Sequence, residues 1–289
     1  MADLPFFPMM RSPSQCPGTA RSAASAGRSA ITVTALLMKL TVIGSADAFN
    51  SSGRGHSCYC VESAGAQTLM VDFGATALMG LRRAGFEPNQ LAGIAFTHLH
   101  GDHIGGFPFL VIDALFNSSR SERLSVLGPP LTRSCLEAPL TATYGNMTAQ
   151  LPLQIDEFAP GEQREFLGYR VAAFAADHML PPHRPLCLRI TDPAGKSVAF
   201  SGDTRPCPGL FAASDSADLL VAECTRLSPP AGQHCTWDDW QRMLPGLRAK
   251  SLLLSHLGSD VREQLPGLRS QIESAIPIQF ADDGMILEC

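Results

Sequence analysis

The sequence predicts an α/β fold (of the α+β kind) in which two β-sheets pack face to face with helices outside them. From Met38 onward, short runs rich in apolar and β-branched residues alternate with longer stretches of helical pattern. This alternation occurs in two halves of similar style, and no linker between them is long enough to separate two domains. We therefore expect residues 38–289 to form a single domain.

The expected elements alternate along the whole of that domain. The expected strands are Lys39–Ile43, Cys58–Glu62, Thr68–Asp72, Leu91–Thr97, Leu124–Leu127, Tyr169–Ala176, Cys187–Thr191, Ser197–Ser201, Leu219–Glu223, Ser251–Ser255 and Met285–Glu288. The expected helices are Ala75–Ala84, Gly105–Phe116, Leu131–Tyr144, Asp238–Arg248 and Asp260–Ala275. A Gly-rich loop, Gly44–Gly55, should join the first two strands.

Residues 1–37 differ from the rest of the chain in composition. They are rich in Ser, Ala, Arg and Pro and lack periodicity, which predicts a disordered tail or an upstream extension with Met38 as the functional start. The apolar run Ile31–Gly44 follows several arginines, as in a signal peptide, but its second half fits the first strand better. Lys39 interrupts the run, which is shorter than the roughly 18 apolar residues that span a bilayer, so no membrane association is expected.

Composition limits which substrates the protein is expected to bind and which cellular compartment it is expected to occupy. The net charge is −5 and only three lysines occur, so we expect a small anionic substrate more readily than long nucleic acid. The nine cysteines are scattered and odd in number, which indicates reduced thiols in a cytoplasmic protein. No Cys-x-x-Cys pair occurs, so no thiolate zinc site is indicated.

The clearest functional motif follows an expected buried strand and opens an expected helix. It runs Thr97-His98-Leu99-His100-Gly101-Asp102-His103. His98 and His100 lie two apart in extended chain, so both rings should point the same way, whereas Asp102 and His103 fall where the backbone turns. Packing alone rarely needs three histidines and an aspartate within six residues, so we interpret the motif as metal-binding.

One short loop cannot saturate two ions, so ligands from distant parts of the chain are expected. His178, Asp203 and His256 each follow an expected strand, and strand exits are where α/β folds gather their chemistry. Together with the motif they supply five imidazoles and two carboxylates. That set suits two divalent ions, with zinc favoured and manganese or iron as alternatives.

The motif and its distant partners, taken in order, resemble the metallo-β-lactamase superfamily, and the likeness runs from Met38 to the C-terminus. Four shorter segments resemble its tRNase Z and arylsulfatase-like branch: Ser201–Cys207, Glu223–Thr225, His234–Thr236 and Ser255–Gly258. The resemblance implies an αββα four-layer sandwich with a two-metal centre at one edge. It further implies one metal on His98, His100 and His178, the other on Asp102, His103 and His256, and Asp203 bridging both.

The resemblance also suggests roles around the metals. Asp72 matches an aspartate that orients the metal loop by hydrogen bonding, with a simple turn-forming residue as the alternative. His234 matches a histidine that protonates the leaving group, with a surface-loop residue as the alternative. Glu223 either orients His234 or caps a helix, and His56 and His183 are expected to be solvated loop residues.

The favoured activity is hydrolysis of a small phosphodiester, cyclic nucleotide or sulfate ester by a metal-bridging hydroxide, with Asp102, His234 and Glu223 as catalytic residues. Processing of tRNA 3′ ends is an alternative. In tRNase Z, however, the interval that corresponds to His178–Asp203 carries a long arm that grips tRNA, and here it spans only 25 positions.

Three further alternatives stay open at this point. They are hydrolysis of a thioester, lactone or β-lactam, a redox di-iron protein, and a non-catalytic metal-binding scaffold. Members of this branch often form homodimers, and the apolar helix Gly105–Phe116 is either a candidate interface or ordinary core.

Overall fold

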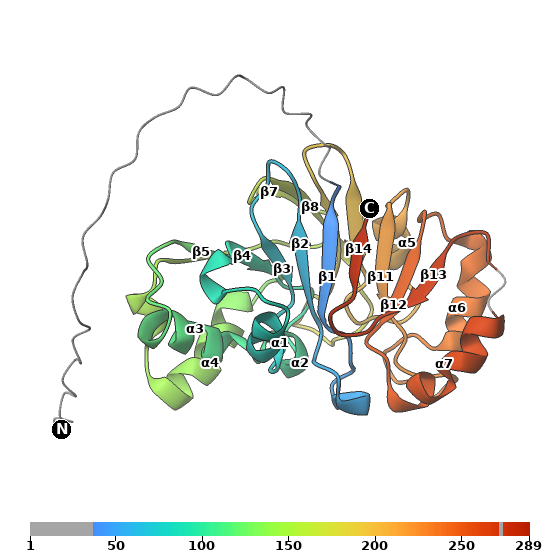
Figure 1. Cartoon of the computed structure of the whole chain (residues 1–289), viewed down its shortest axis with the longest axis horizontal. Helices are drawn as coiled ribbons and strands as arrows, with labels where there is room; N and C mark the ends of the chain where they lie inside the picture. The colour runs from blue at the N-terminus through green and yellow to red at the C-terminus, as the bar shows by residue number, and fades with distance from the viewer. Residues whose placement is uncertain (1–36, 272–273) are drawn as a thin grey trace, which may run out of the picture. The chain divides into compact units, whose positions relative to one another are not determined.

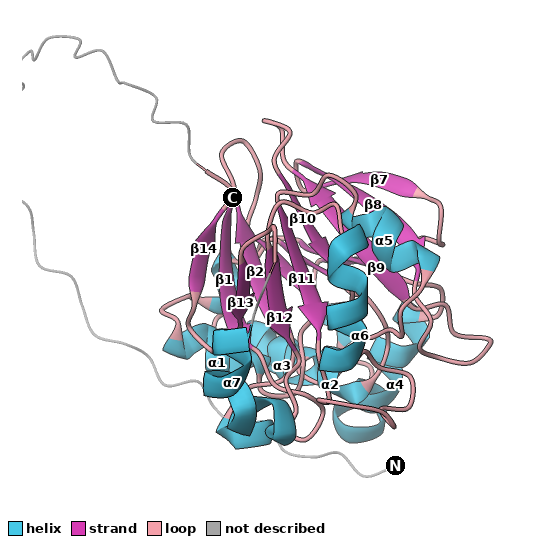
Figure 2. Ribbon diagram, turned by 90° about the vertical axis from the view of Figure 1, so that its right-hand side faces the viewer, coloured by secondary structure: helices cyan, strands magenta, loops and turns pink. Residues whose placement is uncertain are grey.

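The computed structural model describes residues 37–271 and 274–289, which belong to one compact unit. They form two sheets with helices on the outer faces (Figures 1 and 2). This is the α/β architecture that the sequence predicts. Apart from Leu37, the expectation for residues 1–37 lies outside the described residues.

Each sheet contains seven strands. Across the first sheet these are β14 (Ile286–Glu288), β1 (Lys39–Gly44), β2 (Cys58–Glu62), β3 (Leu69–Val71), β4 (Gly93–Ala95), β5 (Leu124–Gly128) and β6 (Leu153–Glu157). Across the second they are β13 (Ile278–Phe280), β12 (Leu252–Ser255), β11 (Leu219–Glu223), β10 (Ser197–Phe200), β9 (Leu186–Thr191), β8 (Tyr169–Ala175) and β7 (Gln163–Phe166). Because β14 pairs with β1, the C-terminal strand completes the sheet that the first half builds.

Helices cover the outer face of each sheet (Figure 1). Beside the first sheet lie α1 (Ala77–Arg83), α2 (Gly101–Ile104), α3 (Phe107–Phe116) and α4 (Thr132–Tyr144), and beside the second lie α5 (Pro208–Ser214), α6 (Trp237–Met243) and α7 (Ser259–Gln271). Short 3-10 helices are η1 (Ser51–Gly53), η2 (Pro88–Gln90), η3 (Thr148–Gln150) and η4 (Leu244–Gly246). None of the described helices has the length and apolar character of a membrane span.

Three apolar clusters hold the layers together. Val71 and Phe200 are buried between the two sheets. Phe107 of α3 is buried against the first sheet, and Trp240 of α6 against the second. Burying one such side chain contributes about 1.5–3 kcal/mol, so the outer helices are fixed firmly on the sheets.

The direction of the central strands determines where a site can form. Strands β3 to β6 run parallel to one another, and so do β10 to β13. Covered on both faces, β11 and β12 are buried along their whole length. The loops that leave the carboxyl ends of these strands therefore meet at one edge, which is where such folds gather functional side chains.

Most expected strands and α-helices are present with shifted ends, but β6, β7, β13, α2 and α5 are not among those predicted. Strand β7 is largely exposed and polar, so it lacks an apolar alternation. Helix α5 begins with Pro208-Gly209, which indicates a turn, yet proline is favoured at the first helical position and Cys207 caps the helix. Helix α7 ends at Gln271, before the expected Ala275, and residues 272–273 are not described.

Candidate metal centre

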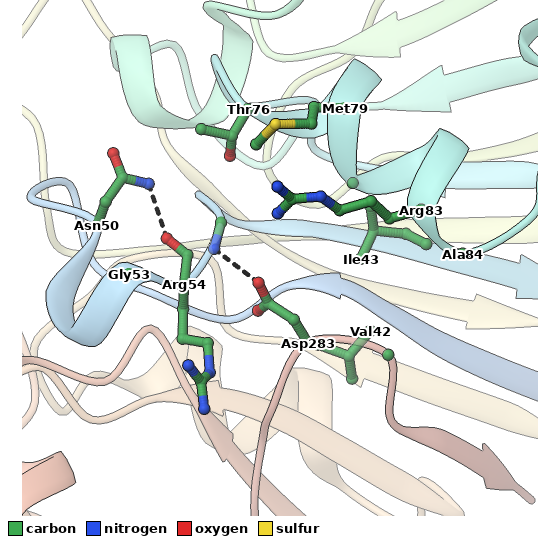
Figure 3. A pocket seen from close by; sticks show the side chains of 13 residues that line it. Val42, Ile43, Asn50, Gly53, Arg54, Thr76, Met79, Arg83, Ala84 and Asp283 are labelled. Atoms are coloured by element: carbon green, nitrogen blue, oxygen red, sulfur yellow. Dashed lines mark hydrogen bonds between the residues drawn. The ribbon is translucent and has the colours of Figure 1, made fainter.

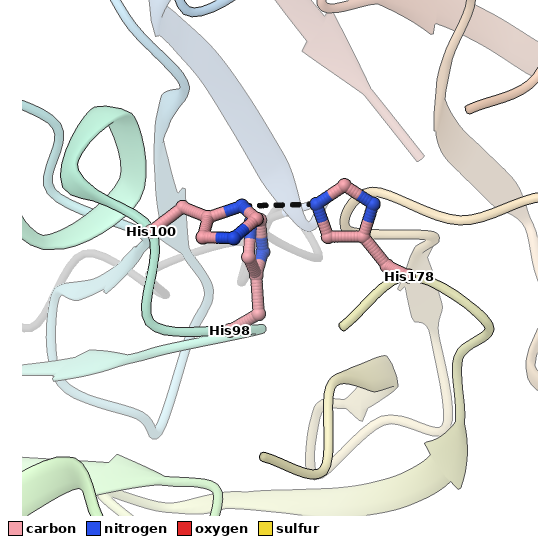
Figure 4. A group of neighbouring side chains, drawn as sticks. All are labelled: His98, His100 and His178. Atoms are coloured by element: carbon pink, nitrogen blue, oxygen red, sulfur yellow. Dashed lines mark hydrogen bonds between the residues drawn. The ribbon is translucent and has the colours of Figure 1, made fainter. Parts of the chain in front are cut away.

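The histidine motif lies where the chain leaves β4 and enters α2. His100 keeps an extended backbone, with φ −74° and ψ 155°, immediately before the helix begins at Gly101. His98 and His100 therefore lie on the same side, as expected, and their ring centroids are 4.9 Å apart (Figure 4). His98 is buried and His100 is exposed, so the pair reaches from the core to the surface.

His178 approaches these two rings from the second sheet, in the loop after β8 (Figure 4). Its Nε2 lies 3.0 Å from Nδ1 of His100, and its ring centroid lies 4.9 Å from that of His98. The three side chains can each present one ligand atom within 4.8 Å of the others. The structure thus brings together the first expected ligand group.

A second group contains Asp102, His103, Asp203 and His256, whose ligand atoms also lie within 4.8 Å of one another. Nε2 of His103 is 3.4 Å from Oδ2 of Asp102 and 3.3 Å from Oδ1 of Asp203. Nε2 of His256 is 3.3 Å from Oδ2 of both aspartates. All four residues thus turn their donor atoms toward one point.

Asp203 lies between the two groups. Its Oδ1 faces His103, whereas its Oδ2 is 3.7 Å from Nε2 of His98 and 3.8 Å from Nε2 of His178. Gly202 makes this approach possible, because its φ is +56° and a Cβ there would come within 2.8 Å of Cβ of Thr97.

Each buried histidine is also held by its far ring nitrogen. The pairs are His98 Nδ1 with Thr97 Oγ1 at 3.1 Å, His103 Nδ1 with Asp72 Oδ2 at 2.7 Å, His178 Nδ1 with the Gln233 carbonyl at 2.9 Å, and His256 Nδ1 with Thr225 Oγ1 at 3.0 Å. Such contacts fix the orientation of the ring. They leave each Nε2 directed toward the centre.

Asp72 makes the contacts expected of an orienting residue. Its carboxylate is buried and accepts hydrogen bonds from the backbone and the hydroxyl of Thr97, at 2.8 Å each, while contacting His103. The residue follows β3 with a left-handed backbone, φ 57°. It therefore joins the start and the end of the histidine motif in addition to forming a turn.

Two buried atoms show that the residues fit a metal ion. Nε2 of His98 and Nε2 of His103 have no hydrogen-bond partner among the described residues. Leaving a buried polar atom unsatisfied costs about 1–3 kcal/mol, and a bound cation removes that cost. Burial, assisted by the nearby His103, holds the pKa of His98 well below its usual value, so this imidazole stays neutral and its lone pair can coordinate.

Charge is balanced tightly across the site. Burial alone would raise the pKa of Asp203, but the facing His256, His103 and His98 hold it well below its usual value. Burial likewise opposes the charged form of His256, yet Asp203 and Asp102 raise its pKa to about 9. Without metal the carboxylates are therefore neutralised by protonated imidazoles, and a metal ion must displace those protons.

His234 borders the centre from the loop before α6. Its Nδ1 lies 3.0 Å from Oε1 of Glu223 and 3.8 Å from Oδ2 of Asp203. Burial opposes its charged form, but the hydrogen bond with Glu223 raises the pKa of His234. Glu223 is buried at the end of β11 and also accepts hydrogen bonds from Thr204 N–H and the Thr225 hydroxyl. Of the two alternatives for Glu223, these contacts match orientation of His234.

Sequence reasoning missed Thr97, Thr225 and the carbonyl of Gln233 as supports of the ligands. The available signal was position, since Thr97 immediately precedes His98 and Thr225 lies in a segment already singled out for its resemblance. His56 and His183 join none of the metal-binding groups found in the described residues.

Known proteins resemble this chain in both sequence and structure. A ribonuclease Z of Methanothermobacter thermautotrophicus is 27% identical over 233 residues, which cover 65% of this chain and 75% of that protein. The metallo-β-lactamase fold protein YhfI from Bacillus subtilis has a TM-score of 0.69 at 23% identity, covering 87% of this chain and 99% of YhfI. A diphosphatase from the PhnP family also has a TM-score of 0.69, at 19% identity, and the match covers 87% of this chain and 98% of the diphosphatase chain.

The fold, the histidine and aspartate cluster, and these similarities define a metal-dependent hydrolase with the metallo-β-lactamase fold, similar in sequence to ribonuclease Z. The family described as Anti-Pycsar protein Apyc1 matches residues 38–274, which include the whole candidate metal centre. The chain belongs to this Anti-Pycsar protein Apyc1 family.

Proposed function

We propose that the chain hydrolyses a small phosphodiester with the help of two divalent ions, zinc being favoured. The convergence of five imidazoles and two carboxylates around Asp203 carries this proposal. A set of nitrogen and oxygen donors without thiolates suits zinc and also admits manganese or iron. The ligands would be His98, His100 and His178 for one ion and Asp102, His103 and His256 for the other, with Asp203 shared.

The chain's own residues would position the reaction and move a proton. Bound ions would supply Lewis acidity to a phosphoryl oxygen and to water. His234 contacts Glu223 through Nδ1, which leaves Nε2 to donate a proton to the departing alkoxide. Glu223 would hold this ring in place, and Asp102 would help to hold the second ion at the reacting edge.

The size of the interval between His178 and Asp203 favours a small substrate. Strands β9 and β10 and their connecting loops fill it, so this segment contributes no arm to grip a folded RNA. The diphosphatase of similar fold and the ribonuclease Z relative are both named for cleavage at phosphorus. Together these observations support a phosphodiesterase more than a thioesterase, lactonase or β-lactamase.

Processing of tRNA is the second candidate, and the similarity to ribonuclease Z supports it. To separate the two, protein loaded in turn with zinc, manganese and iron is assayed on bis(p-nitrophenyl) phosphate and on precursor tRNA. We expect turnover of the small diester and little cleavage of the RNA. Inactivity on the small diester with all three metals would overturn the proposal, and efficient RNA cleavage would favour the second candidate.

A further inference from the structure

We propose that Phe49 and Leu180 form an apolar rim of the metal centre, on which a planar aromatic group of the substrate packs. This inference rests on the proposed function, because it assigns two residues to the substrate of the same site. It concerns a part of the site that neither holds metal nor moves a proton.

The first observation is exposure. Phe49 is 86% exposed and Leu180 is 73% exposed, the two highest values among the exposed large hydrophobic residues in the described part of the chain. Single exposed apolar residues are common on protein surfaces. These two, however, lie on loops that leave the metal-binding edge, one from each sheet.

The loop of Phe49 connects β1 to β2; it contacts the segment of His256 directly and reaches the segment of Asp102 through Gly74. Ala46 forms bridges with His56 and with Leu257, the residue directly after His256. On the other side, Cβ of His56 packs on Gly74. Gly74 in turn lies against the backbone of Asp102, because a Cβ added at Gly74 would come within 2.1 Å of the Asp102 carbonyl oxygen. The loop that carries Phe49 therefore borders the centre itself.

This loop is held in one shape. The buried carboxylate of Asp47 accepts the backbone N–H of Phe49 at 3.2 Å, and the side chain of Asn50 donates to the carbonyl of Arg54 at 2.9 Å (Figure 3). Arg54 is in turn paired with Asp282. Because the backbone around Phe49 is already ordered, binding a ligand there loses little conformational entropy.

Leu180 belongs to the loop between β8 and β9, two residues after His178. Its carbonyl accepts the backbone N–H of His183 at 3.2 Å, which closes a turn and leaves the side chain in solvent. An anionic group drawn to the metal ions would thus have an apolar residue beside it from each sheet. Phenylalanine stacks on the face of a planar ring, and such stacking contributes substantially to the binding of nucleobases.

The test measures binding and does not need turnover. Calorimetry on the zinc-loaded protein compares thymidine 5′-phosphate with methyl phosphate. Both carry a phosphate monoester, but only the thymidine compound carries a sugar and a planar base. We expect Phe49→Ala to raise the Kd of thymidine 5′-phosphate about tenfold and Leu180→Ala to raise it about threefold. The Kd of methyl phosphate should not change, and Phe49→Trp should retain tight binding of the thymidine compound.

Phe116→Ala is the matched control, because Phe116 is 69% exposed at the end of α3 that lies away from the histidine motif. It should leave both Kd values unchanged. Equal weakening of both ligands by Phe49→Ala, no change in either, or failure of the wild-type protein to bind thymidine 5′-phosphate would each overturn the inference. Ring-dependent binding through Phe49 without hydrolysis of any phosphodiester would instead overturn the proposed function and leave the rim in place.

Discussion

Asp203 is the residue whose removal should disrupt the metal centre most. Its two carboxylate oxygens face histidines of both ligand groups, at 3.3–3.8 Å. We expect Asp203→Ala to remove most bound metal, measured by elemental analysis, and to lower turnover more than about a hundredfold. Asp215→Ala, at an exposed carboxylate paired with Arg248, is the control. Full metal content in the Asp203 variant would contradict the assignment.

His234 allows a test of proton donation that does not depend on metal content. A departing p-nitrophenolate needs little protonation, whereas an alkoxide needs it strongly. His234→Ala should therefore reduce turnover of an alkyl-leaving diester by about 10²-fold or more and that of bis(p-nitrophenyl) phosphate only slightly. Steady-state rates on both substrates decide this. Equal losses on the two would show that His234 supports the site and does not donate the proton.

At the scale of elements, the turn after β3 connects the first sheet to the histidine motif. Asp72 in this turn has a left-handed backbone that asparagine also tolerates, so Asp72→Asn changes the charge and keeps the shape. We expect the charge-assisted contact with His103 to weaken and zinc affinity to fall about 10–100-fold, as measured by competition with a chelator. An unchanged zinc affinity would show that Asp72 only forms the turn and does not orient His103.

Helix α6 supports the opposite side of the site, because the indole N–H of Trp240 donates to the carbonyl of Glu223 at 2.8 Å. Thr236 begins this helix with a capping box shared with Asp239. We expect Thr236→Ala to lower the free energy of unfolding by about 1 kcal/mol, seen as a lower midpoint of urea denaturation. Thr143→Ala, at an exposed position in α4, should have a smaller effect. An unshifted midpoint for Thr236→Ala would show that the cap contributes nothing.

At the scale of the whole molecule, the candidate metal centre joins loops from both sheets, so metal binding and folding should be coupled. Zinc should raise the melting temperature measured by calorimetry, because it binds the folded chain preferentially. The raised pKa of His256, about 9, means that protons compete with metal at neutral pH. Zinc affinity and the zinc-induced stabilisation should therefore increase from pH 6 to pH 8. A pH-independent effect would show that these imidazoles do not bind the ion.

The sequence alone predicted the two-sheet architecture and the side chains that the structure brings together. This was possible because strand periodicity is local and because packing alone rarely needs three histidines and an aspartate within six residues. Short edge strands such as β7 and the Pro-Gly start of α5 were missed, since their stability comes from neighbours that lie far away in sequence.

Only the tertiary structure decided at what distances these residues meet and what holds them. Thr97, Thr225 and the carbonyl of Gln233 are ordinary residues in the sequence, and they become supports because parallel strands end at one edge and bring their loops within hydrogen-bonding distance. The types of ligand atom are thus a property of the sequence. The distances between these atoms arise from the packing of the two sheets, because no local interaction can bring the loop after β4 to the loops after β8, β10 and β12.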